Sequence, residues 1–267
     1  MARRCVSEWP QAAAQLAASF WPGPLTIVLP RAKEISDIVT AGGSTVGVRW
    51  PSHPFIQAVI RECGFPLAAP SANQSNELSP TNAEHVQKSL GRRVKLIVDG
   101  GQCQVGIEST VVDASVTPPR VLRPGMIHEE SLRAAVGDLQ TPSDVHGNTS
   151  EALRSPGQLR KHYSPKARLI TLSWRDDADL RAQLRHLNPA PDILHSTCVI
   201  AHSTIPSGEG FGGVHVIPHD AEAFARAIYA ELHRCDEAGA RTIIVEELPD
   251  GPEWRAIADR LHRASAP

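Results

Sequence analysis

Long apolar runs are missing from this chain. The most apolar short stretches, residues 25–29 and 96–98, are far shorter than the roughly 20 residues that cross a bilayer. The N-terminus carries two arginines, but it becomes polar at Ser7 and Glu8 where a secretory signal would have its apolar segment. We therefore expect a cytoplasmic protein with no membrane anchor.

Cysteine pairs and ligand clusters are missing as well. The five cysteines are odd in number, scattered, and never arranged as C-x-x-C, so we expect reduced thiols. Among the twelve histidines, only His215 and His219 stand four apart. Pro218 between them disfavours a helix that would place both rings on one face. The sequence therefore predicts no metal site.

A surplus of positive charge is also missing. The formal net charge is −2, whereas phosphate-driven binding of nucleic acid needs an excess of lysine and arginine. Any binding of RNA, including double-stranded RNA, is therefore expected to be weak or indirect.

Standard phosphate-binding and catalytic motifs are missing too. Neither a G-x-x-x-x-G-K-[ST] nor a G-x-G-x-x-G phosphate loop is present, and no side-chain nucleophile stands beside a base. No catalytic acid, base or nucleophile is identified.

What is present fits a globular protein of two modest domains. The 267 residues are 41% hydrophobic and 21% charged. The first 140 residues mix helices with many strands, which indicates an α/β or α+β domain. Expected strands lie at residues 25–29, 45–50, 66–69, 94–98, 109–113 and 120–122. Expected helices cover residues 10–20 and 53–63, and a capping box from Thr81 to Glu84 begins a third, which ends at Gly91.

A change of composition separates the two domains. Periodicity disappears at residues 141–166 into proline, serine, glycine and asparagine, which is typical of a linker. Beyond it, strands are expected at 169–172, 198–201, 214–217 and 242–245. They alternate in part with helices at 177–186, 221–235 and 253–263. This alternation predicts a small α/β domain with a largely parallel sheet over residues 167–267.

Two arginines lie at the ends of predicted strands, one or two residues before a proline. Arg49 and Arg123 both carry a planar guanidinium that could hold a carboxylate or a phosphate. A solvated arginine at a sheet edge is the commoner situation and remains an alternative for each. Ser109 follows glycines that would let a ligand approach the backbone, although a glycine-rich hairpin explains the same pattern.

Hydroxyl and amide side chains gather in the remaining loops. Ser71, Asn73 and Ser79 precede a predicted helix start and could donate to phosphate or to a purine nitrogen. Turn and cap chemistry explains these residues equally well. Tyr163 lies in the linker beside the basic run 160–162, which could close over a site or simply form a solvated tether.

Taken together, the motifs closely resemble YrdC-like threonylcarbamoyl-adenylate synthases in their two-domain form. In chain order they are Trp21-Pro22-Gly23-Pro24-Leu25-Thr26, Val48-Arg49-Trp50-Pro51, Ala69-Pro70-Ser71-Ala72-Asn73, Ser79-Pro80-Thr81, Asp99-Gly100-Gly101, Gly106-Ile107-Glu108-Ser109-Thr110-Val111-Val112-Asp113 and Leu122-Arg123-Pro124-Gly125. Each motif is weak by itself, but their joint order is specific. The segments 155–157 and 162–165 resemble the family's linker, so the resemblance spans essentially the whole chain.

The resemblance implies a fold and a reaction. Residues 1–140 would form a YrdC-like nucleotide- and threonine-binding domain with a mixed, largely antiparallel sheet. The linker would close over the site, and a Rossmann-like extension domain would follow. L-threonine, bicarbonate and ATP would give threonylcarbamoyl-AMP and pyrophosphate. The product would serve the machinery that makes N6-threonylcarbamoyladenosine at position 37 of tRNA.

Site residues follow from the same likeness. It implies ATP contacts from Thr45, Ser71, Asn73, Ser79, Arg123 and Tyr163. It implies threonine contacts from Arg49, Ala69 and Ser109. Mg²⁺ is expected with the pyrophosphate leaving group.

The sequence departs from the family at two places. Family members begin with a further segment that supplies a threonine contact and a lysine-x-arginine element for the ATP phosphates, and the loop around Lys33 does not match it. We therefore expect the N-terminal part of the domain to be missing, and these 267 residues alone to make little or no adenylate. The linker residues 158–160 also depart from the family's methionine-lysine-aromatic pattern.

Two other functions remain open on the sequence alone. A non-catalytic member of the family could keep the nucleotide or RNA surface and act as a binding or regulatory module. A carbamoyl-transfer enzyme could use the same fold, although the two-domain linker disfavours it.

Overall fold

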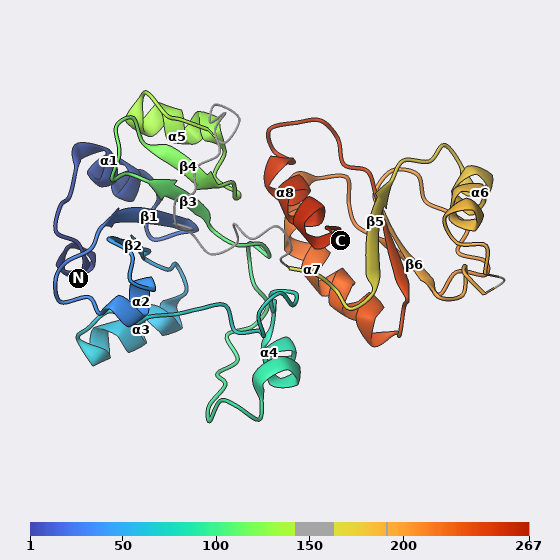
Figure 1. Ribbon diagram of the computed structural model, residues 1–267, viewed down its shortest axis with the longest axis horizontal. Helices are drawn as coiled ribbons and strands as arrows, with labels where there is room; N and C mark the ends of the chain where they lie inside the picture. Colours follow the sequence, from blue (N-terminus) through green and yellow to red (C-terminus); the bar gives the residue numbers. More distant parts are fainter. Residues whose placement is uncertain (142–162, 191, 267) are drawn as a thin grey trace. The chain divides into compact units, whose positions relative to one another are not determined.

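The computed structural model describes residues 1–141, 163–190 and 192–266 (Figure 1). The chain forms two compact units. Unit 1 comprises Met1–Pro70 and Glu108–Gln158, and unit 2 comprises Ser71–Ile107 and Leu159–Pro267. The segment Ser71–Ile107 is therefore grouped with the C-terminal residues, although it precedes the predicted linker in sequence. Each unit is described by itself.

Unit 1 is built on a mixed four-stranded sheet in the order β2-β1-β3-β4. The strands are β1 (Leu25–Pro30), β2 (Thr45–Val48), β3 (Thr110–Asp113) and β4 (Arg120–Arg123). β1 runs antiparallel to β2 and parallel to β3, while β3 and β4 are antiparallel. The predicted mixed, largely antiparallel sheet is confirmed.

Alternation along β1 sends one set of side chains into the core of unit 1. Leu25, Ile27 and Leu29 are fully buried on one face of the sheet. Two helices cover this face, α1 (Gln11–Phe20) through Leu16 and α5 (Glu129–Val136) through Leu132 (Figure 1). Each buried side chain of this size contributes about 1.5–3 kcal/mol. The opposite face of β1 presents Thr26 and is the face that concerns function.

Smaller elements complete unit 1. They are the 3₁₀ helix η1 (Ala2–Cys5), α2 (Asp37–Thr40) and α3 (Pro54–Cys63). α3 begins after His53, whose side chain accepts a hydrogen bond from the Phe55 amide, and it ends at Gly64 with φ 70°. Both ends of α3 agree with the helix expected from sequence.

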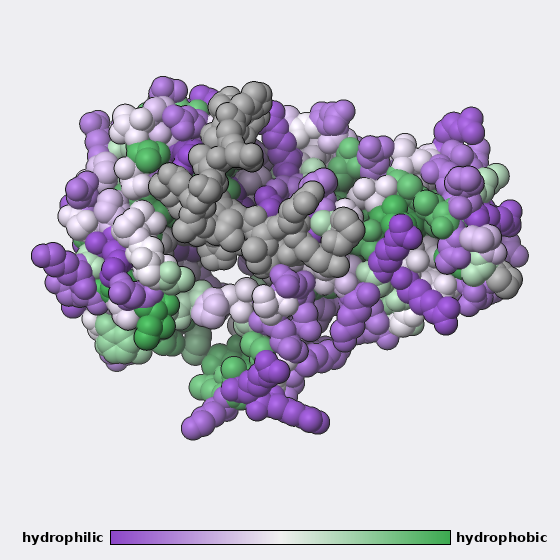
Figure 2. All heavy atoms as spheres, viewed as in Figure 1, coloured by the Kyte–Doolittle hydropathy of each residue, from purple (hydrophilic) through white to green (hydrophobic). Residues whose placement is uncertain are grey.

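Two of the expected strands are wrong. Residues 66–69 and 94–98 are irregular, and neither pairs with a strand in the described part of the chain. Apolar composition alone does not make a strand, because a strand needs a neighbour for its backbone hydrogen bonds. Val94, Leu96 and Val98 are exposed as a result, with Leu96 78% accessible. Figure 2 shows apolar surface in the region of the view where α4 (Ala83–Leu90) lies.

Unit 2 contains a parallel four-stranded sheet in the order β5-β8-β6-β7. The strands are β5 (Arg168–Leu172), β6 (Thr197–Ala201), β7 (Gly213–Val216) and β8 (Thr242–Glu246). α6 (Asp177–Leu187) covers one face, while α7 (Ala221–Glu237) and α8 (Arg255–Ala264) lie on the other (Figure 1). Every residue of β6 is buried, as expected of a strand covered on both sides. The predicted small α/β domain with a parallel sheet is confirmed.

The start of α4 differs from the expected capping box. Asn82, rather than Thr81, caps the helix by accepting a 2.9 Å hydrogen bond from the His85 amide. Thr81 is fully buried, and its amide donates to His85 Nδ1 at 3.3 Å. The His85 ring then stacks on His233 of α7 with centroids 3.8 Å apart.

None of the described helices combines the length and apolarity that a membrane crossing needs.

Candidate functional site

The sheet of unit 1 has a polar face opposite its core. Strand register puts Thr26 on the same face as Val111, and Val28 on the same face as Gly47. Since side chains alternate along each strand, several predicted site residues share this face. We call it the polar sheet face; it carries Thr26, Thr45, Arg49, Ser109 and Arg123.

A buried arginine and two hydroxyl groups form the centre of this face. Arg123 donates from Nε to the Ser109 carbonyl oxygen at 3.1 Å and from a terminal nitrogen to Ser109 Oγ at 3.2 Å. Ser109 Oγ in turn lies 2.9 Å from Thr26 Oγ1. Ser109 and Arg123 are only 7% and 8% exposed. A guanidinium charge held in such a low-dielectric position attracts an anion more strongly than one in water.

The residues around Gly23 position Arg49. Arg49 Nε donates to the Gly23 carbonyl oxygen at 3.0 Å, and the Gly23 amide donates to the Trp50 carbonyl oxygen at 2.9 Å. A Cβ on residue 23 would lie 2.4 Å from the Phe20 carbonyl oxygen, so only glycine fits this approach. The indole of Trp21 donates to the Leu25 carbonyl oxygen at 2.8 Å and fixes the same turn. The motif at residues 21–26 thus serves to hold the exposed Arg49 at the end of β2.

A second glycine explains the residues that follow Arg123. A Cβ on Gly125 would lie 2.4 Å from the Thr110 backbone nitrogen. The chain after β4 can therefore cross closely over the start of β3, where Thr110 Oγ1 accepts a hydrogen bond from the Ile127 amide at 3.2 Å. This crossing sets the position from which Arg123 reaches Ser109.

The other predicted nucleotide contacts lie in unit 2. Asn73 donates from Nδ2 to the Gln74 and Glu77 carbonyl oxygens at 3.0 and 2.9 Å. Its Oδ1 is buried and has no hydrogen-bond partner among the residues that the structure describes. A buried acceptor left unpaired costs about 1–3 kcal/mol, so this oxygen is suited to accept from a ligand. Ser71 is exposed, whereas Ser79 is 9% exposed and its carbonyl oxygen lies 3.2 Å from His233 Nε2.

Tyr163 packs inside unit 2. It is 2% exposed with φ 62°, and its ring lies 5.5 Å from the Arg260 guanidinium and 6.0 Å from the Tyr229 ring. The amide of Ser164 donates to the Asn76 carbonyl oxygen at 3.0 Å, which ties the end of the predicted linker to the Asn73 loop. The predicted linker residues 155–162 lie outside the described residues.

The structure therefore divides the predicted site residues into two groups. Thr45, Arg49, Ser109 and Arg123 share the polar sheet face of unit 1, and Ala69 is an exposed residue of the same unit. Ser71, Asn73, Ser79 and Tyr163 belong to unit 2. Sequence reasoning missed Thr26 as a site residue. Its alternation with Leu25 and Ile27 was a usable signal, because it places the hydroxyl opposite the core.

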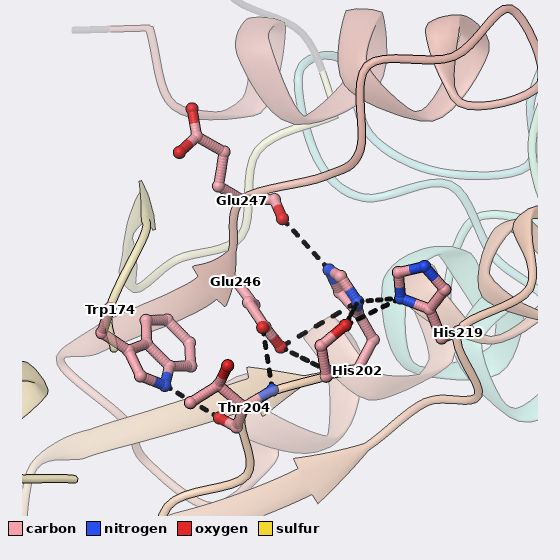
Figure 3. Close-up of polar contacts among 7 residues, drawn as sticks. Trp174, His202, Thr204, His219, Glu246 and Glu247 are labelled. Atoms are coloured by element: carbon pink, nitrogen blue, oxygen red, sulfur yellow. Dashed lines mark hydrogen bonds and ion pairs between the residues drawn. The ribbon is translucent and has the colours of Figure 1, made fainter. Parts of the chain in front are cut away.

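Sequence reasoning also missed a polar cluster at the carboxyl ends of β6, β7 and β8 (Figure 3). Glu246 accepts hydrogen bonds from three successive backbone amides, those of His202, Ser203 and Thr204, at 2.7, 2.8 and 2.9 Å. Burial by itself would raise the pKa of the Glu246 carboxyl, but these donors hold it below its ordinary value. Nδ1 of His202 lies 2.8 Å from Nδ1 of His219. The cluster closes the loop after β6.

Comparison with known proteins identifies relatives along both parts of the chain. The family model described as "Telomere recombination" matches residues 1–125, and the model described as "Threonylcarbamoyl-AMP synthase, C-terminal domain" matches residues 127–266. The threonylcarbamoyl-AMP synthase of Pyrococcus abyssi is 33% identical over 97% of this chain and 75% of its own length. That of Bacillus subtilis is 35% identical over 96% of this chain and 73% of its own length.

A solved structure agrees with these sequence relatives. The crystal structure of Pyrococcus abyssi Sua5 complexed with L-threonine superimposes with a TM-score of 0.86 at 32% identity. The match covers 98% of this chain and 76% of that one. These findings confirm the resemblance that the motifs carry, and the chain belongs to the threonylcarbamoyl-AMP synthase family in its two-domain form.

Proposed function

We propose that this chain provides the substrate sites of a threonylcarbamoyl-AMP synthase, the enzyme that makes threonylcarbamoyl-AMP and pyrophosphate from L-threonine, bicarbonate and ATP. The product would be used by tRNA-modifying machinery to form N6-threonylcarbamoyladenosine at position 37. The observation that carries the proposal is the buried guanidinium of Arg123, fixed on Ser109 beside the hydroxyl group of Thr26. Such a face suits anionic substrates.

The threonine end is assigned to Arg49, Ala69 and Ser109. Arg49 offers a planar fork that matches a carboxylate, and Ser109 offers a hydroxyl group on the same sheet face. The threonine-bound structure of the relative from Pyrococcus abyssi supports an amino-acid site in this fold.

The nucleotide end is assigned by the same reasoning. In unit 1, Thr45 and Arg123 would contact ATP. In unit 2, the candidates are Ser71, Asn73, Ser79 and Tyr163. The unpaired Oδ1 of Asn73 supports this assignment most directly, because the exocyclic amino group of adenine is a donor that it could accept from.

The reaction asks for alignment and charge neutralisation more than for a protein nucleophile. The amino nitrogen of threonine first attacks the carbon of bicarbonate; the C–N bond forms, one C–O bond breaks and water leaves, which gives a carbamate. The carbamate oxygen then attacks the α-phosphorus of ATP, and the bond to the β-phosphate oxygen breaks to release pyrophosphate. Holding the two reactants in line lowers the barrier, as does a preorganised positive charge near the phosphoryl group. Arg123 is the candidate for that charge.

Magnesium belongs to the substrate in this proposal. The described residues of the polar sheet face supply hydroxyl and guanidinium groups, whereas Mg²⁺ takes carboxylate, phosphate and water oxygens. This donor set does not fit the ion, so no residue is assigned to it. ATP would bring the metal on its phosphates.

Coupled binding tests the proposal. ATP is titrated into the protein by calorimetry with and without L-threonine and bicarbonate, and threonine- and bicarbonate-dependent pyrophosphate release is measured beside it. A synthase should bind one substrate more tightly in the presence of the other, because their sites are coupled. A nucleotide- or RNA-binding module without synthase function would show no such coupling, and that result would refute the proposal.

A further inference from the structure

Two cysteines and a histidine meet inside unit 2. Cys198 lies on β6, His215 on β7 and Cys235 on α7. Their sulfur and nitrogen ligand atoms all lie within 4.8 Å of one another. Cys198 and Cys235 are 2% and 0% exposed, and His215 is half-buried. The chain brings these residues together although they are widely separated in sequence.

Strand register explains how two of the three side chains meet. Cys198 is paired with Gly213, and Ile200 with His215, so Cys198 and His215 project from the same face of neighbouring strands. A Cβ on Gly213 would lie 3.1 Å from His215 Nε2 and 3.4 Å from Cys198 Sγ. Both ligand atoms therefore adjoin the space that this glycine leaves open, and α7 brings Cys235 to the same place.

A carboxylate holds the histidine in a defined orientation. Glu231 Oε2 lies 2.7 Å from His215 Nδ1, and Arg234 donates to the same oxygen at 2.9 Å. With Nδ1 occupied by the carboxylate, the Nε2 edge of the ring faces Cys198. Metal-binding histidines characteristically use one ring nitrogen for the ion and the other for a carboxylate or carbonyl group.

Two thiol groups and an imidazole gathered in this way form a ligand set that suits zinc, because Zn²⁺ binds cysteine sulfur and a ring nitrogen of neutral histidine.

We propose that Cys198, His215 and Cys235 bind one zinc ion through two thiolate sulfurs and an imidazole nitrogen. Zinc favours this ligand type in tetrahedral geometry, and a water molecule would complete the set beside the half-buried histidine. Tetrahedral bonds to sulfur and nitrogen place ligand atoms roughly 3.5–3.8 Å apart, which small side-chain rotations would reach from the present cluster. Two thiolates and one Zn²⁺ would leave the buried site neutral.

The ion would join β6, β7 and α7 within unit 2. Its role is structural, and it is independent of the synthase reaction. No short ligand spacing in the sequence marks this site. The parallel pairing of β6 with β7 brings Cys198 and His215 together, and α7 adds Cys235.

Metal titration of the full chain tests this proposal. After removal of metal with a chelator under reducing conditions, the protein is titrated with Zn²⁺ against a chromophoric competitor and with Co²⁺ in a spectrophotometer. We expect one ion per chain and a thiolate-to-cobalt charge-transfer band. Cys198→Ser, Cys235→Ser and His215→Ala should each weaken zinc binding more than roughly 100-fold, and Glu231→Gln roughly 10- to 100-fold. Cys63→Ser, at an exposed cysteine, is the matched control and should bind normally.

Two results would overturn the assignment. One is a wild-type chain that takes up no zinc, or a cobalt complex without thiolate charge transfer. The other is unchanged zinc affinity in all three ligand variants. The cobalt spectrum of the wild-type protein reports the ligand type directly, so the test holds even where a variant fails to fold by circular dichroism.

Discussion

The carboxylate of Glu246 should stabilise the loop that follows β6. It accepts three backbone amides at 2.7–2.9 Å and is 7% exposed (Figure 3). Glu246→Ala removes the acceptor for all three amides at once. A hydrogen bond to a charged group contributes about 1.5–3 kcal/mol, but Ser203 is an exposed residue, so water can replace part of the lost bonding in the variant. We expect a net loss of about 2–4 kcal/mol of local stability.

Native-state hydrogen exchange measures this loss where it occurs. A local opening energy lowered by about 2–4 kcal/mol speeds exchange of the amides at residues 202–204 by roughly 30- to 800-fold. Glu247→Ala is the matched control, because its exposed side chain points away from the cluster in Figure 3. Glu246→Gln should fall between the two, since its amide oxygen still accepts but carries no charge.

The pH dependence follows from the direction of the pKa shift. The pKa of Glu246 is below its ordinary value of 4.5 in the folded protein. Its contribution is therefore complete above about pH 4.5 and is lost as the pH falls through the lower, folded pKa. Exchange at residues 202–204 that is the same in Glu246→Ala and wild type at neutral pH would refute this account of the loop.

Three further outcomes are expected. Arg49→Ala should weaken threonine binding and Arg123→Ala should weaken ATP binding, each by about 1.5–3 kcal/mol in calorimetry; unchanged affinities in both would contradict the site assignment. Burial lowers the pKa of His233 below 6.5 in the folded protein. The folded state therefore favours the neutral ring, and its contribution to the free energy of unfolding is complete above about pH 6.5. This contribution is lost as the pH falls through the folded pKa. His233→Gln should therefore reduce the drop in melting temperature between neutral pH and about pH 5, and an equal drop would count against it. Gly125→Ala should cost about 1–3 kcal/mol in urea unfolding, because its Cβ would lie 2.4 Å from a backbone nitrogen of β3; an unchanged midpoint would show that the crossing can relax.

Local patterns in the sequence were sufficient for most helices and strands. The run at residues 25–29 predicted β1, and the helix expected at residues 53–63 is α3. The buried runs after residue 167 predicted the parallel sheet. These signals are short-range, because side-chain period and capping depend on neighbours within a few residues. The joint order of the loop motifs was likewise enough to identify the family.

Tertiary structure decided what depends on distant partners. Residues 94–98 have the composition of a strand but no strand beside them, so they remain irregular. Ser109 contacts Thr26 and Arg123 only because two other strands bring these side chains to it. Cys198 met its cluster only through the pairing of β6 with β7. A backbone ladder or a ligand set exists only when packing brings its members within bonding distance, and no local period in a sequence encodes that distance.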